Sequence, residues 1–188
     1  SLLGEYEAVF VAVGAHGGVK LPIPGNDLPD VHLATDFLRK VSLEIGEATQ
    51  PPPAGVKGID LSGRRVLVLG GGNVAIDAAM AAVRLGAAWV GMTCLEPRDR
   101  MPAHAWEVAE AEEEGIEVFP ARTFKEVTND SGRVTGVRTV EVNFRGFIDG
   151  RPDFDELAGT EKVIEADVVI FAIGQRPELW IQRDPLVE

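Results

Sequence analysis

The segment from Arg64 to Ala87 constrains the fold more than any other part of this 188-residue chain. It reads RRVLVLGGGNVAIDAAMAAVRLGA: an apolar run, three glycines and then small and apolar residues. Gly70, Gly72 and Ala75 fit the pattern G-x-G-x-x-(G/A) between a strand and a helix, the context that a dinucleotide-binding turn requires. The segment predicts a strand over 65–70, a phosphate-binding turn and a helix over 73–85.

Each position of this turn has its own physical role. Gly70 permits a tight turn, Gly72 lets a pyrophosphate approach the backbone because it has no Cβ, and Ala75 lets the helix lie close to the strand. The N–H groups of the first helical turn, near Asn73 and Val74, would face the phosphates together with the helix dipole. The alternative interpretation is a glycine-rich turn that is purely structural.

Glu96 is the candidate ribose-binding residue. It ends the next expected strand, about 20 residues after Ala75, where an acidic side chain accepts hydrogen bonds from the adenosine ribose and repels a 2′-phosphate. This position favours NAD over NADP. Arg98 and Arg100 favour NADP instead, because arginines just after that strand can pair with its 2′-phosphate. The alternative for Glu96 is a solvated surface carboxylate.

The order of the other segments predicts an α/β fold. Helices are expected over 32–48 and at the end of 97–115, and apolar strands over 7–15, 87–96, 116–120 and within 166–178. Between the last two, spaced valines and the turn signal NDSG predict an antiparallel meander over 121–165. We therefore expect a three-layer, Rossmann-like domain with a parallel central sheet and an antiparallel β-meander crossover.

Composition excludes several classes of protein. The formal net charge of −12 argues against a nucleic-acid partner, and no apolar run approaches the length of a membrane span. We expect no signal peptide, and a single cysteine, Cys94, indicates a reducing cytoplasm and no disulfide framework. His16, His32 and His104 are too scattered to predict a metal site. No residue pattern predicts a catalytic acid, base or nucleophile.

Beyond these motifs, the chain resembles the pyridine-nucleotide domain of the glutamate synthase small-subunit family, which includes the flavin module of dihydropyrimidine dehydrogenase. The resemblance rests on FVAVGA, LPIPGNDLPDVHLATDFLRKV, VLVLGGGNVAIDAA, RLGAAWV, RMPAHAWEVAEAEEEGIEV, GRVTGVR and DVVIFAIGQRPE. It implies an NAD(P)H domain inserted between the halves of an FAD-binding domain. Residues 63–178 would form the NAD(P)H domain, with 1–62 the crossover strand and lead-in from an absent FAD domain and 179–188 a tail toward it.

The resemblance also implies roles for particular residues. The pyrophosphate would lie against Gly70, Gly71, Gly72, Asn73, Val74 and Ala75, and Asp77 would lie near the nicotinamide. The segment Ala172, Ile173, Gly174 and Gln175 would also pass close to the nicotinamide. Members that use NADPH tend to have paired arginines after the second strand. Here Leu95 and Glu96 replace that pair and only Arg98 matches, which again favours NAD.

The function that the resemblance implies is hydride transfer from NAD(P)H to an FAD held mostly outside this chain. Electrons would then pass to iron–sulfur centres on another domain or subunit. Two alternatives remain open. One is a methyltransferase-like domain, since S-adenosylmethionine enzymes also combine a glycine turn with an acidic residue after the second strand. The other is a non-catalytic nucleotide-sensing or interaction module with the same fold.

Overall fold

The computed structural model describes residues 2–10, 12, 14–46 and 61–177. Its centre is a parallel sheet with the strand order β2-β10-β3-β4-β5, and every neighbouring pair in it is parallel. The strands are β2 (Val31–Leu33), β10 (Val168–Phe171), β3 (Arg65–Leu69), β4 (Trp89–Thr93) and β5 (Glu117–Phe119). The expected α/β fold with a parallel central sheet is confirmed.

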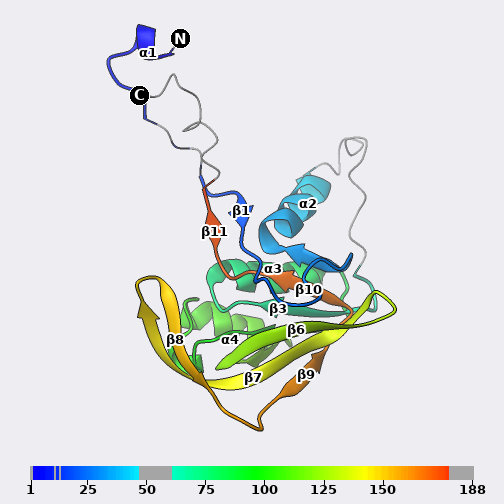
Figure 1. Cartoon of the computed structure of the whole chain (residues 1–188). Helices are drawn as coiled ribbons and strands as arrows, with labels where there is room; N and C mark the ends of the chain where they lie inside the picture. The colour runs from blue at the N-terminus through cyan, green and yellow to red at the C-terminus, as the bar shows by residue number, and fades with distance from the viewer. Residues whose placement is uncertain (1, 11, 13, 47–60, 178–188) are drawn as a thin grey trace.

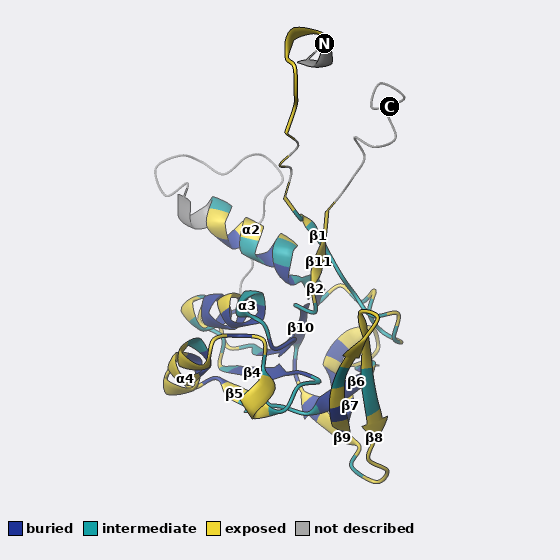
Figure 2. Ribbon diagram, turned by 90° about the vertical axis from the view of Figure 1, so that its left-hand side faces the viewer, coloured by how far each residue is buried: buried dark blue, intermediate teal, exposed yellow. Residues whose placement is uncertain are grey.

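Helices cover one face of this sheet and the antiparallel strands cover the other (Figures 1 and 2). The helical layer contains α2 (Ala34–Gly46), α3 (Asn73–Arg84) and α4 (Ala105–Glu113). The opposite layer contains β6 (Arg122–Asp130), β7 (Arg133–Ile148), β8 (Arg151–Glu156) and β9 (Lys162–Glu165). β6 pairs with one part of β7, and β8 and β9 pair with successive parts of it, so the predicted meander is present.

The central strands supply both hydrophobic cores because their side chains alternate. Val66 and Val68 of β3 pack with the helices, whereas Leu67 and Leu69 pack with the meander. β10 divides its residues between the two cores in the same way. Apart from Arg65 at the start of β3, these two strands are apolar at every position, since both faces of the sheet are covered.

The segment 31–46 joins this domain directly. Val31 to Leu33 add the edge strand β2, and α2 then buries Phe37 and Val41 against the helical core. The sequence predicts a helix from residue 32, so the short strand is a correction. Three residues carry too little periodicity to reveal a strand, and β2 exists because β10 supplies its hydrogen bonds. Residues 47–48 of the expected helix lie outside the described residues.

The prediction of a buried strand over 7–15 is wrong for its described residues. Residues 7–10, 12, 14 and 15 form no strand, and the side chain of Phe10 is 93% exposed. An apolar segment becomes a buried strand only beside a partner, and in the described structure pairing starts at Gly17. There β1 (Gly17–Gly18) pairs antiparallel with β11 (Gln175–Arg176). Before it, a short helix, α1 (Leu2–Glu5), and the residues that follow extend away from the domain (Figure 1).

Candidate functional site

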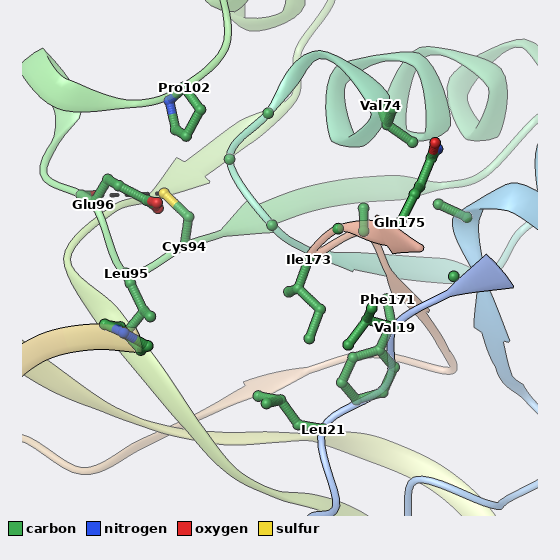
Figure 3. A pocket seen from close by; sticks show the side chains of 18 of the residues that line it. Val19, Leu21, Val74, Cys94, Leu95, Glu96, Pro102, Phe171, Ile173 and Gln175 are labelled. Carbon is green, nitrogen blue, oxygen red and sulfur yellow. Dashed lines mark hydrogen bonds between the residues drawn. The ribbon is translucent and has the colours of Figure 1, made fainter. Parts of the chain in front are cut away.

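A cavity of about 550 Å³ lies at the carboxyl ends of β3, β4 and β10 (Figure 3). β3 and β10 are neighbours in the sheet, but after β3 the chain continues to β4, whereas after β10 it leaves the sheet through β11. The cavity thus lies outside the carboxyl ends of the parallel strands, the edge at which α/β sheets bind ligands. The structure brings two sequence-predicted groups together here. The glycine turn contributes Gly70, Gly71, Gly72, Asn73 and Val74, and the end of β10 contributes Ala172, Ile173, Gly174 and Gln175.

The first two glycines of the turn are required by close packing. Gly70 has a φ of 145°, and a Cβ added there would lie 2.3 Å from the carbonyl oxygen of Ala172. A Cβ on Gly71 would lie 2.8 Å from the Cβ of Cys94. No larger side chain fits at either position, since real Cβ atoms essentially never approach another heavy atom so closely.

Gly72 differs from both, because a Cβ on it would meet nothing within 4 Å. It is the N-cap of α3 and offers no side-chain cap. Within the described part of the chain, no acceptor pairs with the N–H groups of Asn73 and Val74. Open space in front of unpaired helix N–H groups fits a phosphate, which would accept these hydrogen bonds and interact favourably with the helix dipole.

The loop before α4 holds the glycine turn from behind. The N–H of Ala103 donates to the carbonyl oxygen of Gly71 at 3.0 Å. The N–H of His104 donates to the side-chain oxygen of Asn73 at 3.3 Å. These two hydrogen bonds therefore connect the N-terminus of α4 to the glycine turn at the N-terminus of α3.

Glu96 lines the cavity but does not end a strand. β4 ends at Thr93, and the carbonyl oxygen of Glu96 instead accepts a hydrogen bond from the N–H of Ala121. The strand ends earlier than predicted because its ladder with β5 ends where Thr93 pairs with Phe119. Among the described residues, nothing donates to the Glu96 carboxylate, so its oxygens are free to accept ribose hydroxyls.

The two arginines after Glu96 do not line the cavity. Arg98 pairs with Glu112 of α4 at 2.5 Å. Arg100, at the end of the 3-10 helix η1 (Arg98–Arg100), donates to the carbonyl oxygen of Phe144 at 2.6 Å. Both guanidinium groups are thus engaged with other parts of the domain.

Two further predicted residues also lie away from the cavity lining. Ala75 is fully buried in the helical core, where its small side chain lets α3 approach the sheet. Asp77 is exposed on α3. Ala75 would therefore act through packing rather than through contact with a ligand.

The cavity also contains residues that no sequence motif identified. They come from the chain after β1, from the start of α2, from β6 and from the β7–β8 hairpin, and include Val19, Leu21, Thr35, Phe124 and Phe147. The hydroxyl oxygen of Thr35 is buried and has no hydrogen-bond partner among the residues that the structure describes. Most of these side chains are apolar, so the cavity offers hydrophobic walls around a polar glycine turn. Only long-range pairing of β1, β2 and β7 places them here.

Cys94 also lines the cavity, and burial raises the pKa of its thiol to about 12. A thiol with this pKa stays protonated and is a poor nucleophile. Among the residues that the structure describes, no cluster of histidine, cysteine and acidic side chains could hold a metal ion. No helix in the same residues is long and apolar enough to cross a membrane.

The fold and the cavity define a dinucleotide-binding α/β domain. Comparison with known proteins extends this: the chain belongs to the pyridine nucleotide-disulphide oxidoreductase family, whose model matches residues 4–184. The predicted membership of an oxidoreductase family that uses pyridine nucleotides is confirmed.

Individual relatives agree with the more specific resemblance. The chain is 38% identical to the glutamate synthase [NADPH] small chain of Halomonas elongata, over 94% of this chain and 37% of that protein. It is 36% identical to the NADPH-Fe(3+) oxidoreductase subunit beta of Geobacter sulfurreducens, over 97% of this chain and 26% of that protein. The chain thus spans between a quarter and two fifths of the length of these relatives.

Solved structures show the same fold. FprA from Mycobacterium tuberculosis in complex with NADPH superposes with a TM-score of 0.69 at 18% identity, over 93% of this chain and 51% of that one. At this identity the similarity concerns the fold alone.

Proposed function

We propose that this chain is the nicotinamide-dinucleotide-binding domain of a flavin-dependent oxidoreductase. The observation that carries the proposal is the combination at one cavity of open space at Gly72, two unpaired N–H groups on α3 and the free carboxylate of Glu96. The first two features suit a pyrophosphate, and the carboxylate suits the ribose hydroxyls beside it. The family to which the chain belongs supports the same ligand.

The residues of the chain bind and orient the nucleotide rather than react with it. Gly72, Asn73 and Val74 would hold the pyrophosphate, and Glu96 the adenosine ribose. The segment 172–175 would then border the nicotinamide, because it lines the cavity on the β10 side of the turn. When bound, NADH supplies a hydride that the N5 of an FAD held by another domain would accept.

We further propose that NAD(H) is preferred to NADP(H). Both relatives described above carry NADPH in their names, so this preference would distinguish the chain from them. It is supported by the negative charge of Glu96 at the cavity and by the engagement of Arg98 and Arg100 elsewhere. A 2′-phosphate would meet a carboxylate there instead of a guanidinium group.

The parent protein would contain an FAD-binding domain and an iron–sulfur partner. Residues 1–62 and 179–188 were expected to lead from and to that FAD domain, although 31–46 pack within the domain described above. Support for a connection comes from β1 and β11, which pair side by side as the chain enters and leaves this body. The names "small chain" and "subunit beta" also indicate that the relatives work within assemblies. We place the protein in the cytoplasm, where its one free cysteine stays reduced.

Calorimetric titration of the chain with NADH, NADPH and S-adenosylmethionine tests the proposed ligand. We expect saturable binding of NADH, weaker binding of NADPH and no binding of S-adenosylmethionine. Preference for S-adenosylmethionine would support the methyltransferase alternative. If none of the three ligands binds, the result would support the alternative of a non-catalytic interaction module.

A second assay tests whether hydride transfer requires an FAD that another domain of the parent protein holds. The chain with NADH and an artificial electron acceptor should show negligible turnover until flavin-binding residues of the parent protein are supplied. Turnover by the chain alone without flavin would contradict it.

A further inference from the structure

The β7–β8 hairpin forms an unexpected wall of the cavity. Phe147, Gly150 and Pro152 line it together with the glycine turn and Glu96. They arrive from the meander layer, about 50 residues further along the chain than Glu96. Phe147 remains 58% exposed, so a large apolar ring is left open at the cavity. An exposed ring beside a polar ligand site can act as a stacking surface.

A β-bulge gives Phe147 this position. The register between β7 and β8 shifts between Phe144 and Gly146, so that one residue of β7 is left over. Without the shift, Phe144 and Phe147 would point to opposite faces of the hairpin, because side chains alternate along a strand. With it, both rings lie on one face with their centroids 5.5 Å apart in an edge-to-face arrangement.

Arg100 fastens the bulge to the loop after β4. Its guanidinium donates to the carbonyl oxygen of Phe144 at 2.6 Å and to that of Arg145 at 3.4 Å. It also lies over the Phe144 ring, 5.6 Å from the centroid. The hairpin is therefore tied to the loop that carries Glu96.

We propose that Phe147 is a specificity-determining residue that stacks on the adenine of the bound dinucleotide. This inference rests on the proposed function, which places the adenosine ribose at Glu96. The adenine is attached to that ribose, on the side away from the pyrophosphate and the glycine turn. Leu95, which follows Cys94 and precedes Glu96, and the hairpin line the same cavity, and Phe147 is the exposed aromatic side chain that the hairpin contributes to it.

The test compares Phe147→Ala with Ile148→Ala. Ile148 is the next residue of the hairpin and is 63% exposed, but it does not line this cavity. The ligands are NADH, ADP-ribose, which keeps the adenosine, and reduced nicotinamide mononucleotide, which lacks it. Phe147→Ala should weaken the binding of NADH and of ADP-ribose by about tenfold and leave the affinity for the mononucleotide unchanged, because stacking is lost only for ligands that contain adenine. Ile148→Ala should bind all three like the original chain.

Two further variants separate stacking from a structural role. Phe147→Tyr keeps an aromatic face and should keep the affinity for ADP-ribose. Phe147→Trp should show tryptophan quenching that saturates with ADP-ribose and does not respond to the mononucleotide. Normal ADP-ribose binding by Phe147→Ala, or equal weakening of all three ligands, would overturn the inference and leave the proposed function intact. If the original chain binds neither NADH nor ADP-ribose, the proposed function itself fails.

Discussion

Gly70 and Ala172 meet backbone to backbone where β3 and β10 end, and a Cβ on Gly70 would lie 2.3 Å from the Ala172 carbonyl oxygen. This contact lets the turn fold closely over the end of the neighbouring strand. Gly70→Ala should therefore destabilise the chain by at least about 2 kcal/mol, through the clash and the positive φ together. Denaturant unfolding measures this loss. A stability equal to that of the original chain would mean that the turn can move away from β10.

Gly72→Ala is the matched substitution in the same turn. Its φ of −94° suits any residue, and its Cβ meets nothing within 4 Å. The expected loss of stability is below about 1 kcal/mol, the scale of an N-cap change. NADH affinity should nevertheless fall by on the order of tenfold, because the methyl group would occupy the space of the pyrophosphate. Calorimetry measures it, and unchanged affinity would place the phosphates elsewhere.

Glu96→Ala tests the choice of nucleotide. Loss of a charged acceptor for the ribose hydroxyls should weaken NADH by about tenfold or more. The affinity for NADPH should fall less than that for NADH, or rise, because a negative charge near the 2′-phosphate is removed. The gap between the two dissociation constants would then narrow. If the unmodified chain already binds NADPH more tightly than NADH, the proposed preference is wrong.

Cys94 should resist alkylation in the folded chain. Burial raises its pKa to about 12, so the reactive thiolate is scarce at neutral pH. We expect iodoacetamide to label it on the order of a thousandfold more slowly than an ordinary thiol. The same chain in guanidinium chloride serves as the control and should label readily. Equal rates in both conditions would show that the cavity opens often.

His32 should make the stability of the chain fall toward acidic pH. Burial is the main cause that lowers its pKa below the ordinary 6.5, with a smaller contribution from Lys40. The unfolded chain then binds more protons between the two pKa values, so the free energy of unfolding decreases as the pH drops through them. His32→Gln should show a smaller decrease between pH 7 and pH 5 in urea unfolding. His16→Gln, at an exposed position, is the control and should follow the original chain.

The elements that were predicted correctly carry their own local signals. β3 and α3 could be located because Gly70 and Gly72 separate a segment with the apolar pattern of a buried strand from a segment with the pattern of a helix. The meander followed from turn signals such as that around Ser131, which adopts a positive φ in the turn between β6 and β7. Such features depend on neighbours in sequence, so a single sequence contains them.

The elements that were missed depend on distant partners. β2 can be recognised only from its pairing with β10. The apolar segment through Phe10 has the sequence pattern of a strand, but in the described residues no partner strand pairs with it. The same holds for the site. The turn and Glu96 were predicted from spacing, whereas Phe147 reaches the cavity through a bulge whose register depends on β8. Arg100 was predicted to be able to pair with a 2′-phosphate, and its hydrogen bond to the Phe144 carbonyl oxygen has no local signature in the sequence.

The hydrogen bonds from Ala103 and His104 to the glycine turn have a further consequence. They fix the Gly71 carbonyl and the Asn73 side chain, two groups that could otherwise turn toward the cradle and compete for its N–H donors. On the proposed function, the donors would stay available before a phosphate binds, and little conformational entropy would be lost on binding. The site would then be preorganised by the loop that leads into α4.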